Sequence, residues 1–311
     1  MRDIVAWQSL VDEFLSYRSG LGYNNWAYAF YLPKFAQYAA QQRAKHLTTQ
    51  LAIDWICTFQ EPDTREYLET YLRTFAKFCV KSDPRTEVLL AHTFSRSKRR
   101  KIPHIFSDEE LAELQKATAA LYPQDGLRSS TYRAIFGLLA SSGLRTAEAI
   151  RLTRSDVDLN SGVLSIRNGK GQKSRFVPLH PTAVRALTLY ARKRDLRIPS
   201  PSCERFFVTD RGRPLGRHGP DYALRCLAKR LHWHVRGDYK MHRCRDLRHT
   251  FIVRNITNSR SKGQEFDNIS LALATYVGHD NISYTYWYMT AVPDLMEMAS
   301  RRFHACAKAL P

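Results

Sequence analysis

Apolar residues recur at helical spacing through the first ninety residues of the chain. A first helix begins near position 4 with Trp7, Val11 and Phe14 on one face, and glycines at positions 20 and 22 end it. Three more helices follow by the same criterion: one with Trp26, Phe30, Phe35 and Tyr38 that is kinked or broken at Pro33, one beginning after Thr48 or Thr49, and one from about Arg65 to Val80. Four such helices predict a small bundle whose aromatic side chains form its core.

The pattern changes after residue 106. Ser107 and Glu110 form a capping box that opens a new helix, and an apolar helix over 131–142 ends at Gly143. Alternating residues in 163–167 and 174–178 predict a β-hairpin, which is followed by further helices, at 181–194 and 222–231. The chain is therefore expected to be mainly α with a small antiparallel β-sheet: an N-terminal helical bundle over 1–92, a linker over 93–106, and an α+β domain over 107–311.

The charge of the chain points to an anionic partner. Lys and Arg number 48 against 29 Asp and Glu, which gives a formal net charge of +19 spread along the whole sequence. Such a distribution favours nucleic acid over a local membrane patch. The linker carries five cations in the six residues from Arg96 to Lys101, which suits a connector laid along a DNA backbone, although a solvated basic tether has the same composition.

Several protein classes are excluded by composition. The N-terminus has no signal-peptide pattern, and no apolar run approaches the ~20 residues of a membrane helix. The six cysteines are scattered, as expected of buried thiols in a reducing cytoplasm. His232, His234, His242 and Cys244 match no familiar zinc spacing, so no metal is expected.

Candidate chemistry is concentrated between Arg245 and Tyr288. This segment contains paired arginines, a histidine after a glycine, and three closely spaced tyrosines. Arginine binds phosphate with two parallel hydrogen bonds, histidine can donate to an oxyanion or move a proton, and tyrosine can act as a covalent nucleophile. On a basic chain, these types together indicate chemistry on a nucleic-acid phosphate.

Two motifs earlier in the chain complete the set. Arg145 begins a short predicted helix with Glu148 one turn on, where the carboxylate could orient the guanidinium. Lys170 lies in a Gly-Lys-Gly turn at the tip of the predicted hairpin, from which it could reach a substrate. An ordinary surface ion pair and a solvated turn are the alternative interpretations of these two motifs.

In order and spacing, these motifs resemble the tyrosine recombinase, or phage integrase, family, which includes XerC/XerD-like site-specific recombinases and mobile-element integrases. The residues that carry the resemblance are Gly143-Leu144-Arg145 with Glu148, Gly169-Lys170-Gly171, Asp246 to Phe251, Gly278-His279, and Tyr288. The resemblance spans the chain. It implies a SAM-like core-binding DNA-binding domain at the N-terminus and a catalytic domain from Ser107 onward.

The resemblance also implies a role for each residue. Arg145 and Arg248 would bind the non-bridging oxygens of the scissile phosphate, and His279 would hydrogen-bond the same group. Lys170 would protonate the departing 5′ oxygen, and Tyr288 would attack phosphorus to form a 3′-phosphotyrosine. No cofactor, metal or ATP is implied, because the phosphotyrosine ester keeps the bond energy.

One position departs from the family pattern. Three residues before the second arginine the family most often has histidine, and this chain has Arg245. Arginine stays protonated and is a poor base, although it can bind phosphate and lower a tyrosine pKa by its charge. Family spacing favours Tyr288 over Tyr284 and Tyr286 as nucleophile.

The expected function is therefore a site-specific recombinase or integrase, acting as a tetramer on double-stranded DNA, either as a homotetramer or mixed with related recombinases. In the family, a C-terminal tail such as 293–310 packs on a neighbouring protomer; packing on its own domain is the alternative. Two other functions stay open: a type IB topoisomerase-like relaxing enzyme, and a catalytically weakened accessory subunit in which Arg245 marks lost activity.

Overall fold

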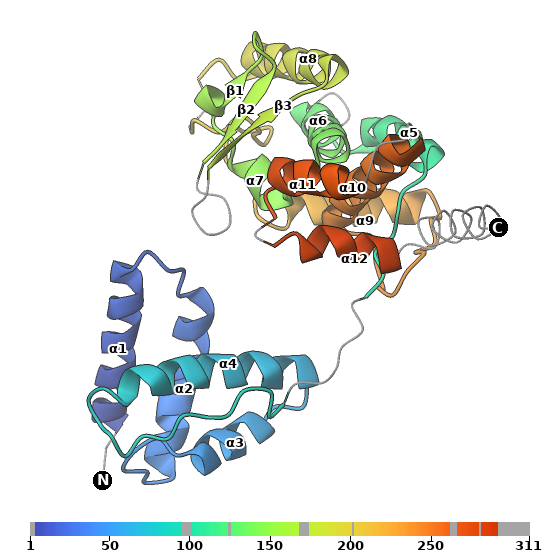
Figure 1. The fold of residues 1–311 in the computed structure, drawn as a ribbon. Helices are drawn as coiled ribbons and strands as arrows, with labels where there is room; N and C mark the ends of the chain where they lie inside the picture. The colour runs from blue at the N-terminus through green and yellow to red at the C-terminus, as the bar shows by residue number, and fades with distance from the viewer. Residues whose placement is uncertain are drawn as a thin grey trace, which may run out of the picture. The chain divides into compact units, whose positions relative to one another are not determined.

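The protein consists of two compact units, Met1–Arg99 and Arg100–Pro311, each with its own apolar core. The computed structural model describes residues 4–94, 101–123, 126–167, 174–200, 202–261, 266–279 and 281–291 (Figure 1). The expected hairpin tip at 168–173 and the tail over 293–310 lie outside these residues, as do all but the last of the linker cations.

The first unit is the predicted bundle of helices (Figure 1). Its elements are α1 (Ile4–Gly20), α2 (Trp26–Gln41), α3 (Thr49–Cys57) and α4 (Pro62–Cys79). Thr48 begins α3 by accepting a hydrogen bond from the Leu51 amide at 3.1 Å, which satisfies one of the amides that a helix start leaves unpaired. Trp7, Phe35 and Phe75 are fully buried and close the core between the helices.

Two aromatic residues of α2 are not in this core, contrary to the prediction. Trp26 is 73% exposed and Phe30 49% exposed, and their rings stack on each other. At about 100° per residue, Phe30 and Trp26 point roughly 140° and 180° away from the buried Phe35. The helix also continues through Pro33, so the break that was one of the two outcomes expected there does not occur.

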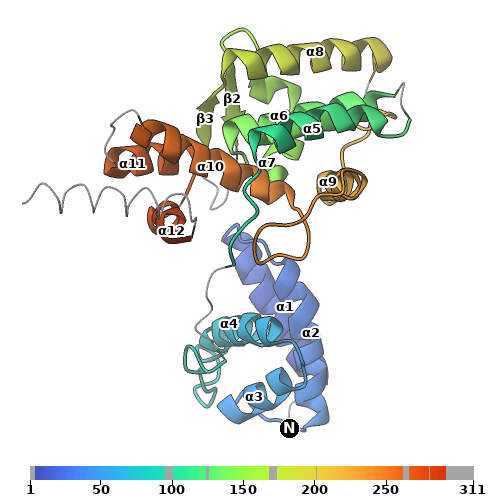
Figure 2. The same ribbon diagram turned by 90° about the vertical axis from the view of Figure 1, so that its right-hand side faces the viewer.

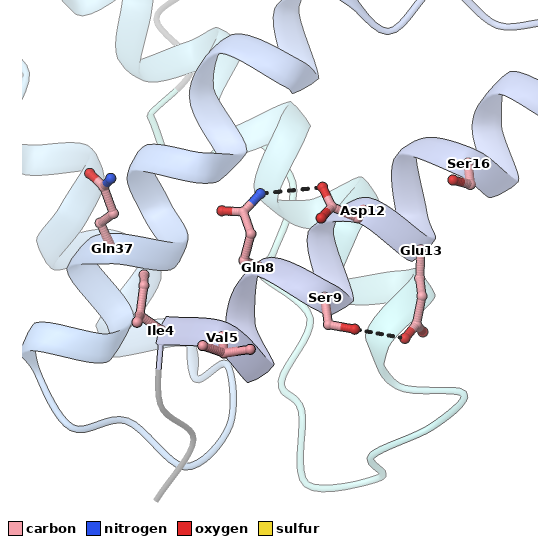
Figure 3. A pocket seen from close by; sticks show the side chains of 8 residues that line it. All are labelled: Ile4, Val5, Gln8, Ser9, Asp12, Glu13, Ser16 and Gln37. Atoms are coloured by element: carbon pink, nitrogen blue, oxygen red, sulfur yellow. Dashed lines mark hydrogen bonds between the residues drawn. The ribbon is translucent and has the colours of Figure 1, made fainter.

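A shallow hollow lies along α1, and Figure 3 labels the side chains that line it. Gln8 donates to Asp12 at 3.3 Å, and Ser9 donates to Glu13 at 3.4 Å. The lining contains no arginine, histidine or tyrosine, so it lacks the groups that act on a phosphate.

The second unit is built around α6 (Leu127–Ser142), which packs against α8 (Pro181–Arg197) and α10 (Cys244–Ser261) (Figures 1 and 2). Its sheet has the antiparallel order β1-β2-β3, with Leu164 opposite Val157 on one side and Val177 on the other. The strands are β1 (Val157–Asp158), β2 (Val163–Ile166) and β3 (Arg175–Pro178), and the other helices are α5 (Asp108–Ala117), α7 (Thr146–Arg151), α9 (Gly219–Arg230), α11 (Phe266–Val277) and α12 (Ser283–Ala291). The predicted fold class, mainly α with a small antiparallel sheet, is confirmed.

The second unit begins within the segment that was expected to be the linker. The Ile102 amide donates to Asp238 at 2.7 Å, and the Phe106 amide donates to the Thr250 hydroxyl at 2.9 Å. The Phe106 side chain is only 1% exposed within the main core. Hydrogen bonds and apolar burial therefore fix residues 102–106 to the second unit, although they were expected to belong to the linker.

A smaller apolar cluster joins α10, α11 and α12. Ile252 and Ile256 of α10 pack with Leu273 of α11 and Tyr288 of α12. This cluster brings the tyrosine-bearing helix against the helix that carries the paired arginines. Among the described helices, none is both long enough and apolar enough to cross a bilayer.

Candidate active site

Three arginines from different elements meet the C-terminal end of α11. Arg175 of β3, Arg248 of α10 and Arg145 before α7 donate to the backbone carbonyls at 276, 277 and 278, at 2.9, 2.9 and 2.7 Å respectively. The last carbonyls of a helix have no partner within it and carry partial negative charge. The end of α11 therefore gathers cations and fixes their positions.

Glu148 links two of these arginines. Its carboxylate accepts from Arg145 at 2.8 Å and from both terminal nitrogens of Arg175 at 3.1 and 2.9 Å. It also accepts from the Arg145 amide at 3.0 Å, which places Arg145 as the N-cap of α7. Burial acts to raise the pKa of Glu148, but hydrogen bonds from Arg175 and the Arg145 backbone outweigh it and lower that pKa to about 2.

Arg248 is held from two sides in the interior. Besides the α11 carbonyl, it donates to the Gly143 carbonyl at 2.8 Å, and it is 5% exposed. Burial, and then repulsion from Arg145, lower the pKa of Arg248 to about 9, so it remains charged at neutral pH. Gly143 has φ +61°, and a Cβ there would clash with the Phe251 ring, so glycine is required to end α6 at this point.

Tyr288 lies on α12 with its phenol in contact with His249 of α10. The Tyr288 oxygen and His249 Nδ1 are 2.5 Å apart, and Tyr288 is 3% exposed. The phenol also interacts electrostatically with Arg248. A tyrosine, a histidine and the second arginine of the motif thus meet at one place.

The neighbouring tyrosines differ from Tyr288. Tyr286 donates to Asp267 at 2.6 Å, and this hydrogen bond to a carboxylate raises the pKa of Tyr286. Tyr284 is 41% exposed, with its ring 6.0 Å from that of His279. An acceptor carboxylate disfavours the phenolate, so Tyr286 has surroundings unsuited to a nucleophile.

His279 follows α11 directly and is set by two contacts. Its amide donates to the Ala274 carbonyl at 2.8 Å, and its Nδ1 lies 2.9 Å from the Thr285 hydroxyl of α12. Gly278, with φ +68°, makes the turn that brings the histidine there, and a Cβ at Gly278 would meet the Arg175 guanidinium at 2.9 Å.

The structure brings together most of the residues predicted from the sequence. Arg145, Arg248 and His279 surround the end of α11, and Tyr288 contacts the helix that carries Arg248. Arg245 is exposed on the first turn of α10, close enough to His249 to lower its pKa. Lys170 lies outside the described residues, so its predicted place in the site stays a prediction.

Two residues of this arrangement were not predicted. His249 lies in the Asp246–Phe251 motif, but no role was predicted for it. Its position one turn after Arg245 on a helix is a signal that could have identified it. Arg175 was assigned only to a strand, and nothing in an isolated strand pattern reveals that its side chain reaches Glu148. Within the described residues, no three His, Cys, Asp or Glu side chains gather to hold a metal ion.

Chemically, the site is a set of fixed cationic donors beside a buried tyrosine and its half-buried histidine partner, as suits nucleophilic attack on a phosphodiester. Residues 105–293, more than half of the chain, match the model of the phage integrase family. The chain belongs to this family. Phage integrases are tyrosine recombinases, and the resemblance inferred from the motifs is thereby confirmed.

Relatives agree with this membership. The putative integrase/recombinase y4rE of Sinorhizobium fredii is 38% identical over 295 residues, which cover 94% of each chain. The tyrosine recombinase XerC of Lacticaseibacillus casei is 29% identical over 230 residues, covering 70% of this chain and 68% of the relative.

Solved structures share the fold. A XerH site-specific recombinase bound to palindromic difH substrate, in a post-cleavage complex, superposes with a TM-score of 0.65 at 16% identity, covering 88% of this chain and 78% of that one. The Tn1549 transposon integrase in complex with circular intermediate DNA also gives 0.65, at 15% identity, covering 95% and 98%.

The chain is accordingly a DNA strand-transferase of the tyrosine recombinase type, which cuts and rejoins DNA through a phosphotyrosine. The accessory-subunit and topoisomerase-like alternatives are not favoured by these relatives.

Proposed function

We propose that Tyr288 is the nucleophile of this recombinase and attacks the scissile phosphodiester to give a 3′-phosphotyrosine. The observation that carries the proposal is the contact of its phenol with His249 at 2.5 Å, beside the charged Arg248. A nearby cation stabilises the phenolate, and a base in contact can remove its proton. The Tyr286 hydroxyl instead donates to the Asp267 carboxylate, whose negative charge disfavours the phenolate.

Arg145 and Arg248 bind the non-bridging oxygens and stabilise the charge that grows on them during attack. Both guanidiniums are already oriented by carbonyls at the end of α11 and by Glu148 or Gly143, so little reorganisation is needed when phosphate arrives. His279, whose ring orientation is set by Thr285, donates to the same phosphate.

Lys170 protonates the 5′ oxygen as it leaves, and support for this comes from the base of its hairpin. β3 begins at Arg175, which bridges to Glu148 and so to the neighbourhood of Arg145. Lys170 precedes Arg175 by only five residues in the sequence, a span of at most about 18 Å, which supports its assignment to the same site. Arg245 adds a phosphate contact and positive charge.

In the assembled reaction, the first unit acts as a core-binding DNA-binding domain and the linker follows the backbone of the duplex. Four protomers, identical or mixed with related recombinases, hold two double-stranded DNA sites as an integrase or mobile-element transposase would. The relatives' complexes with difH substrate and with circular intermediate DNA support the choice of DNA as partner.

A nicked suicide duplex tests the nucleophile, since loss of a short strand traps the covalent intermediate. Wild type is expected to give a protein–DNA adduct that maps to Tyr288, and Tyr288→Phe none. Tyr286→Phe and Tyr284→Phe are matched controls and should retain the adduct. An adduct that survives in Tyr288→Phe would overturn the assignment.

Two duplexes of different length test the assembly. Strand exchange yields products that join strands from both duplexes, whereas a relaxing enzyme rejoins each strand to its own duplex. Mass measurement of the synaptic complex should give four protomers. A complex that recombines with only two protomers would refute the tetramer.

A further inference from the structure

We infer that His249 is the proton acceptor for Tyr288 and performs the task that Arg245 cannot. This inference rests on the proposed role of Tyr288. Neither the family motif nor the sequence pattern gave His249 a catalytic function.

The geometry of α10 allows His249 to take the place of the histidine that the family most often has at position 245. Arg245, Arg248 and His249 lie on the same face of the helix, because residues three and four apart are neighbours there. The Tyr288 hydroxyl, carried by α12, meets His249 Nδ1 at 2.5 Å, with ring centroids 5.6 Å apart. The contact is within the distance at which a general base works.

The groups that face His249 explain when it can act. Arg243 just before α10, Arg245 and Arg248 of α10, and His279 after α11 each act to lower its pKa, and Tyr288 and Trp287 of α12 pack on the ring. Burial, followed by Arg245, lowers the pKa of His249 to about 3, so in the free protein the ring is neutral at working pH but is a weak base. A bound phosphodiester brings negative charge among the same arginines, which offsets their repulsion and makes the imidazolium easier to form.

The protons of the cleavage step balance. The phenol O–H bond of Tyr288 breaks and an N–H bond forms at His249 Nδ1, while the phenol oxygen bonds to phosphorus. The bond from phosphorus to the 5′ oxygen breaks, and that oxygen takes a proton from Lys170. In the rejoining step, the 5′ hydroxyl returns its proton to Lys170 and His249 returns one to the departing phenol.

Arg245 then has a complementary role. It is fixed in its charged state, so it cannot accept the phenolic proton, but its charge favours the phenolate. The pair Arg245 and His249 thus divides the charge-stabilising and proton-accepting functions between two side chains of α10.

The test measures the rate of adduct formation on a suicide duplex with a 5′-bridging phosphorothiolate. A thiolate leaves without protonation, so this substrate removes the need for Lys170 and isolates the proton taken from Tyr288. His249→Asn keeps a polar side chain but no base, and we expect its rate to fall by roughly 10²–10³-fold. The exposed His234→Asn is the matched control and should react like wild type.

A second variant separates a lost base from a damaged fold. Adding R245H to H249N restores the histidine that the family most often has at this position, and the rate should recover at least tenfold with a titration near the ordinary histidine pKa. The inference is overturned if H249N reacts at the wild-type rate, or if R245H gives no recovery while melting temperature and DNA affinity stay unchanged.

The same assay distinguishes this inference from the proposed function. If the wild-type adduct maps to a tyrosine other than Tyr288, the proposed function fails. If the adduct maps to Tyr288 and H249N leaves its rate unchanged, only the inference about His249 fails.

Discussion

At the residue scale, the site depends on buried charges that are held by hydrogen bonds and ion pairs. Glu148 pairs with the guanidiniums of Arg145 and Arg175 at once, and its side chain is 7% exposed. Removing one partner of a buried ion pair leaves an uncompensated charge, which costs more than the pair contributes in isolation.

Glu148→Gln should therefore destabilise the second unit by about 3 kcal/mol at pH 7. The folded pKa, about 2, is below the ordinary value of 4.5, so the carboxylate stabilises the fold above pH 4.5. That contribution is lost as pH falls from 4.5 to 2, and the two proteins should converge there. Urea unfolding at several pH values measures the difference. The exposed Glu204→Gln is the control, and a pH-independent difference would contradict the assignment.

Gly278→Ala should disturb the site in a second way. A residue with a Cβ is strained at φ +68°, and the new atom would displace the Arg175 guanidinium 2.9 Å away. We expect a loss of about 1–3 kcal/mol and a marked drop in adduct formation. Melting temperature and the suicide-substrate assay provide the readouts. Gly216→Ala, whose Cβ would have no neighbour within 4 Å, should change neither, and equal effects at both positions would exclude this explanation.

At the scale of elements, the sequence predicted correctly those features that depend on residues close together in the chain, such as helix caps and the strands of a hairpin. The Ser107–Glu110 capping box forms as expected, and the 163–167 and 174–178 segments pair as a hairpin. The prediction that Trp26 and Phe30 lie in the core was wrong. An aromatic residue on a helix can be assigned to the buried face only after its angular position is compared with that of the other apolar residues of the helix. The contact of Arg175 with Glu148 joins residues 27 apart and depends on tertiary packing.

Arg175→Lys tests that packing. Lysine cannot donate to Glu148 and to the end of α11 with the planar fork of arginine, so β3 should dock less firmly. We expect a loss of about 2 kcal/mol in stability and slower cleavage with DNA affinity nearly unchanged. Arg167→Lys is the control on the same hairpin, since Arg167 is 66% exposed. Equal losses in the two variants would show that the fork of Arg175 is not required.

At the scale of the whole molecule, the net charge of +19 predicts binding that depends strongly on salt. Changing Arg96, Lys98, Arg99 and Arg100 to glutamine should lower the slope of log affinity against log salt by up to about 3.6 if each contacts a phosphate. Fluorescence anisotropy on duplex DNA measures the slope.

The matched control removes four exposed cations of α8: Arg185, Arg192, Lys193 and Arg197. Figures 1 and 2 place α8 and α12 at opposite ends of the second unit, so this helix should contribute little to binding. Equal changes in slope for both sets would mean that the linker cations contribute to DNA binding only through the net charge of the chain.

The arginines and the nucleophile are supported by different parts of the second unit. Among the described residues, the hydrogen bonds that orient Arg145 and Arg248 come from residue 143, Glu148 and the end of α11, and none comes from α12. Displacing α12 would take Tyr288 from His249 and Thr285 from His279, while the hydrogen bonds that orient Arg145 and Arg248 stay in place. A protein in that state would hold an intact strand through its two arginines without cutting it, so the position of α12 would decide whether cleavage follows binding.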